Sequence, residues 1–211
     1  MTIIAFDFDG TLSQDEMTVL LGERKNVADR MSSITEQAMN DEIEYADSLR
    51  QRIALLEDLP GEDVGAAFDN VDLRPGAADV LTAVGDAGNT TAILTGGFVR
   101  GVRHVLDREG TTVDVLIANT LEAEDGHLTG EVSGPLIEGT KDIALRALAD
   151  EHGITLADTV AIGDGANDLP MLRAAGLAIG FDPKPAVADA CDVTVSSMDE
   201  LRSVLRERGH L

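Results

Sequence analysis

The stretch IIAFDFDGT, residues 3–11, decides the fold class of this chain. Its first four residues form a short apolar run, and the acidic residues and the glycine that follow end that run at once. Such a pattern is typical of a buried strand that leads into a loop. The pattern therefore predicts that Asp7 and Asp9 stand directly after the first strand.

Comparable apolar runs recur along the chain and alternate with amphipathic helical patterns. This alternation predicts an α/β fold: a doubly wound, Rossmann-like parallel sheet with helices on both faces. The further strands are expected at residues 91–94, 113–117, 160–162 and 176–180, and the helices at residues 77–87, 99–108, 141–152 and 169–175.

Two segments depart from the alternation. Residues 16–71 contain no strand-like run and carry amphipathic patterns, such as that of residues 43–53, up to a break at Pro75-Gly76. We expect a helical cap domain at 16–71, inserted after the first strand into a core made of residues 1–15 and 72–211. Residues 121–132 form two short strand-like pieces about Asp125-Gly126, which predicts a hairpin.

Composition narrows the classes of function. The chain has 211 residues, 16 Lys and Arg against 39 Asp and Glu, a net charge of −23, and 44% hydrophobic residues. Enough apolar side chains are present for a folded core, and a negative field disfavours nucleic acid and anionic membranes while favouring divalent cations. The single cysteine, Cys191, excludes an internal disulfide and a cysteine zinc site.

The location of the protein is also constrained. The chain starts without a cationic segment followed by an apolar stretch, and no apolar run approaches the ~18 residues of a membrane helix. We expect a cytoplasmic protein. Lysine occurs only at Lys25, Lys141 and Lys184. An acidic, lysine-poor composition favours a halophilic source, since molar salt screens repulsion between acids; the alternative is an ordinary acidic protein selected for solubility.

Four segments carry groups that could perform chemistry. Ligands bind beyond the carboxyl ends of the strands in doubly wound sheets, so residues expected in loops after strands are the candidates. Together they offer carboxylates for a metal, a hydroxyl and N–H groups for an anion, and one cation. Each alone could be a helix cap, a turn or a solvated charge. The groups are Asp7 and Asp9; Thr95, Gly96 and Gly97; Lys141; and Asp164, Asn167 and Asp168.

Two other motifs are excluded, and a third is disfavoured. An EF-hand calcium loop starting at Asp7 requires glycine where Leu12 stands. A dinucleotide fingerprint at residues 163–168 requires glycine where Asp168 stands. The four histidines fall in expected helices, the hairpin or the tail, which disfavours a Ser-His-Asp triad.

The order of the four segments resembles the motifs of the haloacid dehalogenase-like phosphatase superfamily, and the resemblance covers the whole chain. The helical insert resembles the small cap of the phosphoserine phosphatases, with four residues that match its pattern: Glu16, Met39, Tyr45 and Arg52. Three residues depart from what is frequent there: Gly10 and Thr95 each replace a serine, and Tyr45 replaces a phenylalanine.

The resemblance implies a Mg²⁺-dependent phosphatase that acts on phosphoserine through an aspartyl phosphate. In it, Asp7 is the nucleophile, Asp9 the general acid and base, and Lys141 the catalytic cation. The metal would be held by Asp7, Asp9 through its backbone carbonyl, and Asp164, supported by Asn167 or Asp168. Substrate contacts are implied for Glu16, Met39, Tyr45, Arg52, Thr95, Gly96 and Asn167.

Other functions stay open at this point. They are a phosphatase for another small phosphomonoester such as phosphothreonine, a phosphotransferase with an acceptor such as homoserine, and a non-catalytic phosphate or metal sensor. The sequence leaves the oligomeric state undecided.

Overall fold

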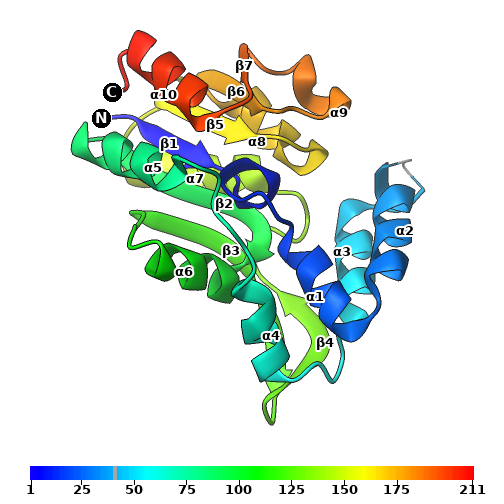
Figure 1. The fold of residues 1–211 in the computed structure, drawn as a ribbon. Helices are drawn as coiled ribbons and strands as arrows, with labels where there is room; N and C mark the ends of the chain where they lie inside the picture. Colours follow the sequence, from blue (N-terminus) through cyan, green and yellow to red (C-terminus); the bar gives the residue numbers. More distant parts are fainter. Residues whose placement is uncertain (40–41) are drawn as a thin grey trace.

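The computed structural model describes residues 1–39 and 42–211, and its centre is a sheet of seven strands (Figure 1). The strand order is β4-β3-β2-β1-β5-β6-β7. Neighbouring strands are parallel except β3 and β4, which are antiparallel. The strands are β1 (Ile3–Phe6), β2 (Thr90–Phe98), β3 (Val115–Glu124), β4 (His127–Ser133), β5 (Thr159–Gly163), β6 (Leu177–Phe181) and β7 (Val193–Val195).

Helices cover both faces of this sheet, as predicted. Ile4 and Phe6 of β1 pack into a core with α5, α6 and α10, whereas Ile3 and Ala5 pack into a second core with α7, α8 and α9. The alternation follows from the two-residue period of a strand. These helices are α5 (Ala77–Asp86), α6 (Val99–Arg108), α7 (Lys141–Glu151), α8 (Leu169–Ala174), α9 (Pro185–Ala188) and α10 (Met198–Glu207).

The four helices predicted from periodicity correspond to α5, α6, α7 and α8, so those predictions are confirmed to within one residue at each end. The hairpin is confirmed as well. Asp125 and Gly126 join β3 to β4 with φ values of 51° and 82°, the left-handed region that a two-residue hairpin turn requires. In the described part of the chain, no helix combines the length and the apolar character needed to cross a membrane.

Two strand predictions were wrong in extent. Thr95, Gly96 and Gly97 lie inside β2 rather than in a loop after it. The pairing of β2 with β3 shifts register between Leu94 and Phe98, and this irregularity lets the glycines continue the strand. Residues 115–124 form one strand, β3, which pairs with β2 along its first part and with β4 along its second.

Among the described residues, four α-helices lie between the first strand and α5. Their apolar side chains, among them Met17, Leu21, Leu49 and Phe68, belong to the same core as Ile4 and Phe6. The segments entering and leaving this region pair with each other at Ser13 and Leu73. In Figure 1, α1, α2 and α3 gather beyond the end of β1. The helices are α1 (Met17–Lys25), α2 (Ala28–Met39), α3 (Tyr45–Ala54) and α4 (Gly61–Phe68).

The remaining elements had no predicted counterpart. β7, α9 and α10 follow residue 180, and none of them was predicted from the sequence. Three short turns complete the order, and two of them carry site residues: η1 (Phe8–Leu12), η2 (Leu156–Asp158) and η3 (Ala166–Asp168).

Candidate active site

The acidic groups singled out in the sequence meet at the carboxyl ends of adjacent strands. β1 lies between β2 and β5 in the sheet. Asp7 follows β1 directly, and Asp164 follows β5. Lys141 begins α7 and reaches the same point. The parallel sheet thus brings together residues that are up to 157 positions apart in the chain, the distance from Asp7 to Asp164.

Lys141 is the buried cation of this site. Its side chain is 2% exposed, and Nζ lies 2.6 Å from Asp7 Oδ1 and 2.5 Å from Asp168 Oδ1. Burial on its own lowers the pKa of Lys141, but the two carboxylates outweigh it and raise that pKa above its ordinary value. The two carboxylates therefore favour the charged form of Lys141.

Asp168 positions its neighbours. One oxygen binds Lys141, and the other accepts the backbone N–H groups of Asp164 at 3.0 Å and Gly165 at 2.9 Å. A side chain at Gly163 would collide with Asp168, because a Cβ there would lie 2.5 Å from Asp168 Cγ. Both oxygens of Asp168 thus help to fix Lys141 and the loop that carries Asp164.

Asp7 and Asp9 have shifted acidities. Burial, followed by the charge of Asp168, raises the pKa of Asp7 to about 7, against the lowering effect of Lys141. Burial, followed by the charges of Asp7 and Glu16, raises the pKa of Asp9 well above its usual range. Asp9 Oδ1 is buried with no hydrogen-bond partner among residues 1–39 and 42–211. Both the burial and the neighbouring acids therefore favour the protonated form of Asp9.

The carboxylates make a cluster of the kind that holds a divalent metal ion. Oxygens of Asp7, Asp164 and Asp168 lie within 4.8 Å of one another, and all three residues are buried. Burial, with the charge of Asp168, also raises the pKa of Asp164. Hard divalent cations take oxygen ligands of this kind, and such an ion offsets the excess of negative charge. The cluster shares Asp7 and Asp164 with the predicted ligand set, and Asp168 supports it through Lys141.

The backbone of β2 approaches the site at its two glycines. A Cβ on Gly96 would overlap the Tyr45 hydroxyl, and one on Gly97 would lie 3.0 Å from Asp9 Oδ2. The Gly97 N–H donates to Thr95 Oγ1 at 3.0 Å. A side chain at Gly96 would therefore require the Tyr45 ring of α3 to move.

The helical region contributes a buried arginine. Arg52 of α3 is 8% exposed; its Nε donates to the Ser48 carbonyl at 3.3 Å and Nη1 to Thr18 Oγ1 at 3.5 Å. Burial lowers the pKa of Arg52, and the charges of Tyr45, Glu16 and Asp9 oppose that shift. Arg52 therefore lies within electrostatic reach of the core acids as well as of its own helix.

The other predicted residues stand at the edges of this arrangement. Glu16 is exposed and directly precedes α1. Asn167, in η3, has its amide nitrogen 3.8 Å from where a Gly96 Cβ would lie. Met39 is the last residue of α2, and its side chain lies outside the described part of the structure.

Comparison with known proteins shows which family this chain belongs to. The family model described as haloacid dehalogenase-like hydrolase matches residues 4–173, which include every core residue of the site. The chain belongs to this family.

Individual relatives of this hydrolase are close. It is 52% identical over 209 residues to a phosphoserine phosphatase of Halobacterium salinarum, covering 99% of both chains. It is 37% identical over 205 residues to the phosphoserine phosphatase of Methanocaldococcus jannaschii, covering 97% of this chain and 96% of that one. A solved substrate-bound phosphoserine phosphatase complex superimposes with a TM-score of 0.89 at 35% identity, over 98% and 97% of the two chains.

Sequence reasoning missed several residues that support the site of this hydrolase. Thr11 Oγ1 donates to Asp164 Oδ1 at 3.4 Å, and Arg74 donates to the Gly10 carbonyl at 2.9 Å. Asn119 donates to the Gly96 carbonyl at 3.1 Å and accepts the Leu136 N–H at 3.0 Å. Thr11 ends the stretch of residues 3–11 and Arg74 adjoins the Pro75-Gly76 break, whereas Asn119 had no sequence signal.

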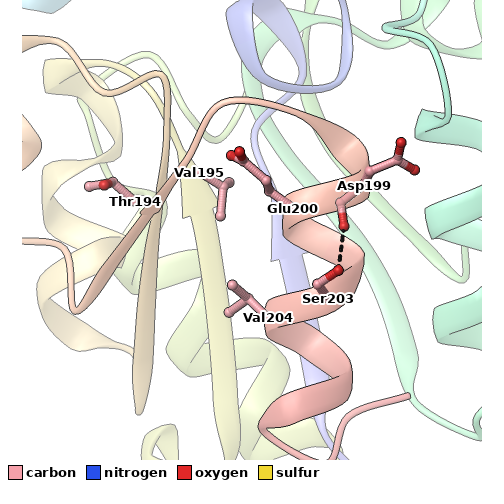
Figure 2. A pocket seen from close by; sticks show the side chains of 6 residues that line it. All are labelled: Thr194, Val195, Asp199, Glu200, Ser203 and Val204. Carbon is pink, nitrogen blue, oxygen red and sulfur yellow. Dashed lines mark hydrogen bonds between the residues drawn. The ribbon is translucent and has the colours of Figure 1, made fainter.

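A cavity of about 330 Å³ lies elsewhere in the hydrolase, between β7 and α10 (Figure 2). Its lining has two acids, Asp199 and Glu200, and no cation. The hydroxyl of Ser203 in this cavity donates to the Asp199 carbonyl of its own helix. The cavity therefore lacks the groups that an anionic substrate needs.

Proposed function

We propose that this chain is a Mg²⁺-dependent phosphoserine phosphatase that hydrolyses O-phospho-L-serine to L-serine and phosphate in the cytoplasm. The observation that carries the proposal is the pairing of Asp7, held by buried Lys141, with a second buried carboxyl two residues later, Asp9, whose pKa burial raises. A site that only senses phosphate or metal has no need of a second carboxyl that holds a proton. The close relatives named phosphoserine phosphatase supply the choice of substrate.

In the first half of the proposed reaction, a carboxylate oxygen of Asp7 attacks phosphorus. The bond between phosphorus and the serine oxygen breaks, and Asp9 gives its proton to that departing oxygen. The product is serine together with a phosphorylated Asp7. Lys141 contributes by favouring the ionised form of Asp7, whose pKa burial has raised to about 7.

In the second half, water attacks the phosphorus of the aspartyl phosphate and its proton passes to Asp9. The bond between phosphorus and Asp7 breaks, so that phosphate leaves and both carboxyls return to their starting state. When bound by Asp7, Asp164 and the Asp9 carbonyl, Mg²⁺ would supply positive charge against the dianionic phosphoryl group. Asp168 keeps Lys141 and the Asp164 loop in place throughout.

The phosphoryl oxygens would be bound by the Thr95 hydroxyl, the Gly96 N–H and Lys141, with Asn167 beside them. The short distance between β2 and Tyr45 supports this phosphoryl-binding site, because at Gly96 only the backbone faces Tyr45. Hydrogen-bond donors that are already positioned around the charge that develops in the transition state usually make the largest single contribution to catalysis.

We propose that residues 16–71 act as a cap over a core of residues 1–15 and 72–211. The two crossing segments support this division, since Ser13 pairs with Leu73 and the Arg74 N–H donates to the Leu12 carbonyl at 2.8 Å. Within the cap, Arg52 would bind the substrate carboxylate and Glu16 its ammonium, while Met39 and Tyr45 line the pocket. Closure of the cap excludes water from the first half of the reaction.

The proposal is tested by phosphate release in high KCl with Mg²⁺ from four substrates: phosphoserine, phosphothreonine, phosphoglycolate and a sugar phosphate. We expect a strong preference for phosphoserine, abolished by EDTA and by Asp7→Asn. Equal rates on all four substrates would contradict the proposed role of the cap. The absence of turnover in the wild type would contradict the enzyme itself.

A further inference from the structure

Lys184 is a lysine that the proposed reaction does not use. Its Nζ lies 3.0 Å from Asp164 Oδ2 and 3.9 Å from Glu16 Oε1. Asp164 belongs to the core and Glu16 begins the helical insert, so one ammonium stands between two carboxylates of different parts of the site. The second oxygen of Asp164 already accepts the Thr11 hydroxyl.

The backbone presents this lysine at a fixed place. Pro183 and Pro185 flank it and restrict its conformation to the extended region, where φ is −62° and ψ is 152°. Its N–H donates to the Asp164 carbonyl at 2.8 Å. Gly180 makes room for this turn, since a Cβ there would lie 2.9 Å from Pro183. A pre-arranged backbone reduces the entropy that the ion pair costs.

The side chain itself remains free to leave. It is 49% exposed, whereas that of Lys141 is 2% exposed. Lys141 is locked between two buried carboxylates, but Lys184 can exchange its contact with Asp164 for one with Glu16 or with water. The two lysines at this site therefore differ in kind: one is a fixed part of the site and the other is displaceable.

We propose that the Lys184 ammonium competes for Asp164 and Glu16 with the two cations that bind there, and so weakens the binding of both. The two cations are the divalent metal ion and the ammonium group of the substrate. This inference rests on the proposed function, in which a divalent ion binds Asp164 and the α-ammonium of the substrate binds Glu16. Each of these cations must displace Lys184 or bind against its charge. After hydrolysis, the same lysine returns to Glu16 and speeds the release of the amine product.

The test is calorimetric titration with Mg²⁺ alone, in the absence of substrate, on the wild type and three variants. Lys184→Met removes the charge and Lys184→Arg keeps it. Lys25→Met makes the same chemical change at the end of α1, outside the site. We expect Lys184→Met to bind Mg²⁺ about tenfold more tightly, because a unit charge beside a divalent ion opposes binding by about this factor even in water-like surroundings. Lys184→Arg and Lys25→Met should stay within about twofold of the wild type.

Unchanged or weaker Mg²⁺ binding in Lys184→Met would overturn the inference, since the lysine would then be a bystander or a support for Asp164. A second readout addresses Glu16: KM for phosphoserine should fall in Lys184→Met, while KM for phosphoglycolate, which has no ammonium, falls less. If the wild type hydrolyses phosphoserine and Lys184→Met binds Mg²⁺ as the wild type does, only the proposed role of Lys184 is contradicted. If the wild type does not hydrolyse phosphoserine, the proposed function is contradicted. The Mg²⁺ titration still tests the role of Lys184 at Asp164.

Discussion

Replacement of Lys141 by methionine is the most informative perturbation of the buried site. The change removes the ammonium that lies 2.6 Å from Asp7 and 2.5 Å from Asp168, and it leaves two buried carboxylates without a counter-charge. Breaking a buried pair in this way costs about 3–5 kcal/mol when the remaining charges stay ionised. We therefore expect Lys141→Met to lose up to about that much unfolding free energy at alkaline pH, where the carboxylates are ionised.

The loss should depend on pH with a definite sign. Burial and the charge of Asp168 already raise the pKa of Asp7 to about 7, and without Lys141 it rises further. A carboxyl with a raised folded-state pKa contributes stability below its unfolded pKa of ~4 and loses it as pH rises through the folded value. The deficit of Lys141→Met relative to the wild type should thus shrink toward about pH 5, where protonation relieves the repulsion.

The assay is urea unfolding of both proteins at several pH values in constant high KCl, with Lys25→Met as the matched control. In parallel, kcat for phosphoserine should fall by at least about 10²-fold in Lys141→Met, the cost of removing one fixed electrostatic group from an active site. A deficit that is equal at low and high pH would refute the reasoning, because it would come from lost packing rather than from unpaired charge.

Three further outcomes are expected. The acidic limb of the pH profile of kcat/KM should lie near pH 7 at limiting Mg²⁺ and move to lower pH at saturating Mg²⁺, because Asp7 must be ionised to attack and a bound cation lowers its pKa; a limb insensitive to Mg²⁺ would argue against Asp7 as a ligand. Gly96→Ala should raise KM by about tenfold or more, since its methyl group overlaps the Tyr45 hydroxyl, and Tyr45→Phe should restore part of the loss; no recovery in the double variant would place the clash elsewhere. The thermal midpoint should rise with KCl as the Debye length falls from about 10 Å at 0.1 M to about 3 Å at 1 M, screening a net charge of −23; a midpoint that falls or stays constant would reject the salt-adapted interpretation of the composition.

Periodicity located most of the framework. The helices at Ala77–Asp86, Val99–Arg108 and Lys141–Glu151 bury apolar residues at helical spacing, so periodicity predicts their bounds. Gly96 and Gly97 misled the same reasoning, because glycine usually ends a strand. Here the partner strand β3 holds them in line through Asn119, a residue 23 positions from Gly96. No local pattern encodes such a contact.

The site was predictable in its members but not in its connections. The positions of Asp7, Asp164 and Lys141 after strands or at a helix start follow from the motif order. Asp168 uses one oxygen to bind Lys141 and the other to bind the Asp164 loop. These contacts depend on distances between elements that are far apart in the sequence, so no local pattern predicts them. The same holds for Lys184, whose only signal in the sequence was the scarcity of lysine.

The central claim, that Asp7 carries the phosphoryl group, can be measured directly. The enzyme is mixed with phosphoserine and Mg²⁺, quenched in acid within one turnover and reduced with borohydride, which converts an aspartyl phosphate to homoserine. Peptide mass spectrometry should find homoserine at Asp7, and none at any site in Asp7→Asn. Phosphate released at the normal rate with Asp7 unmodified, or with the modification at another carboxylate, would contradict the account.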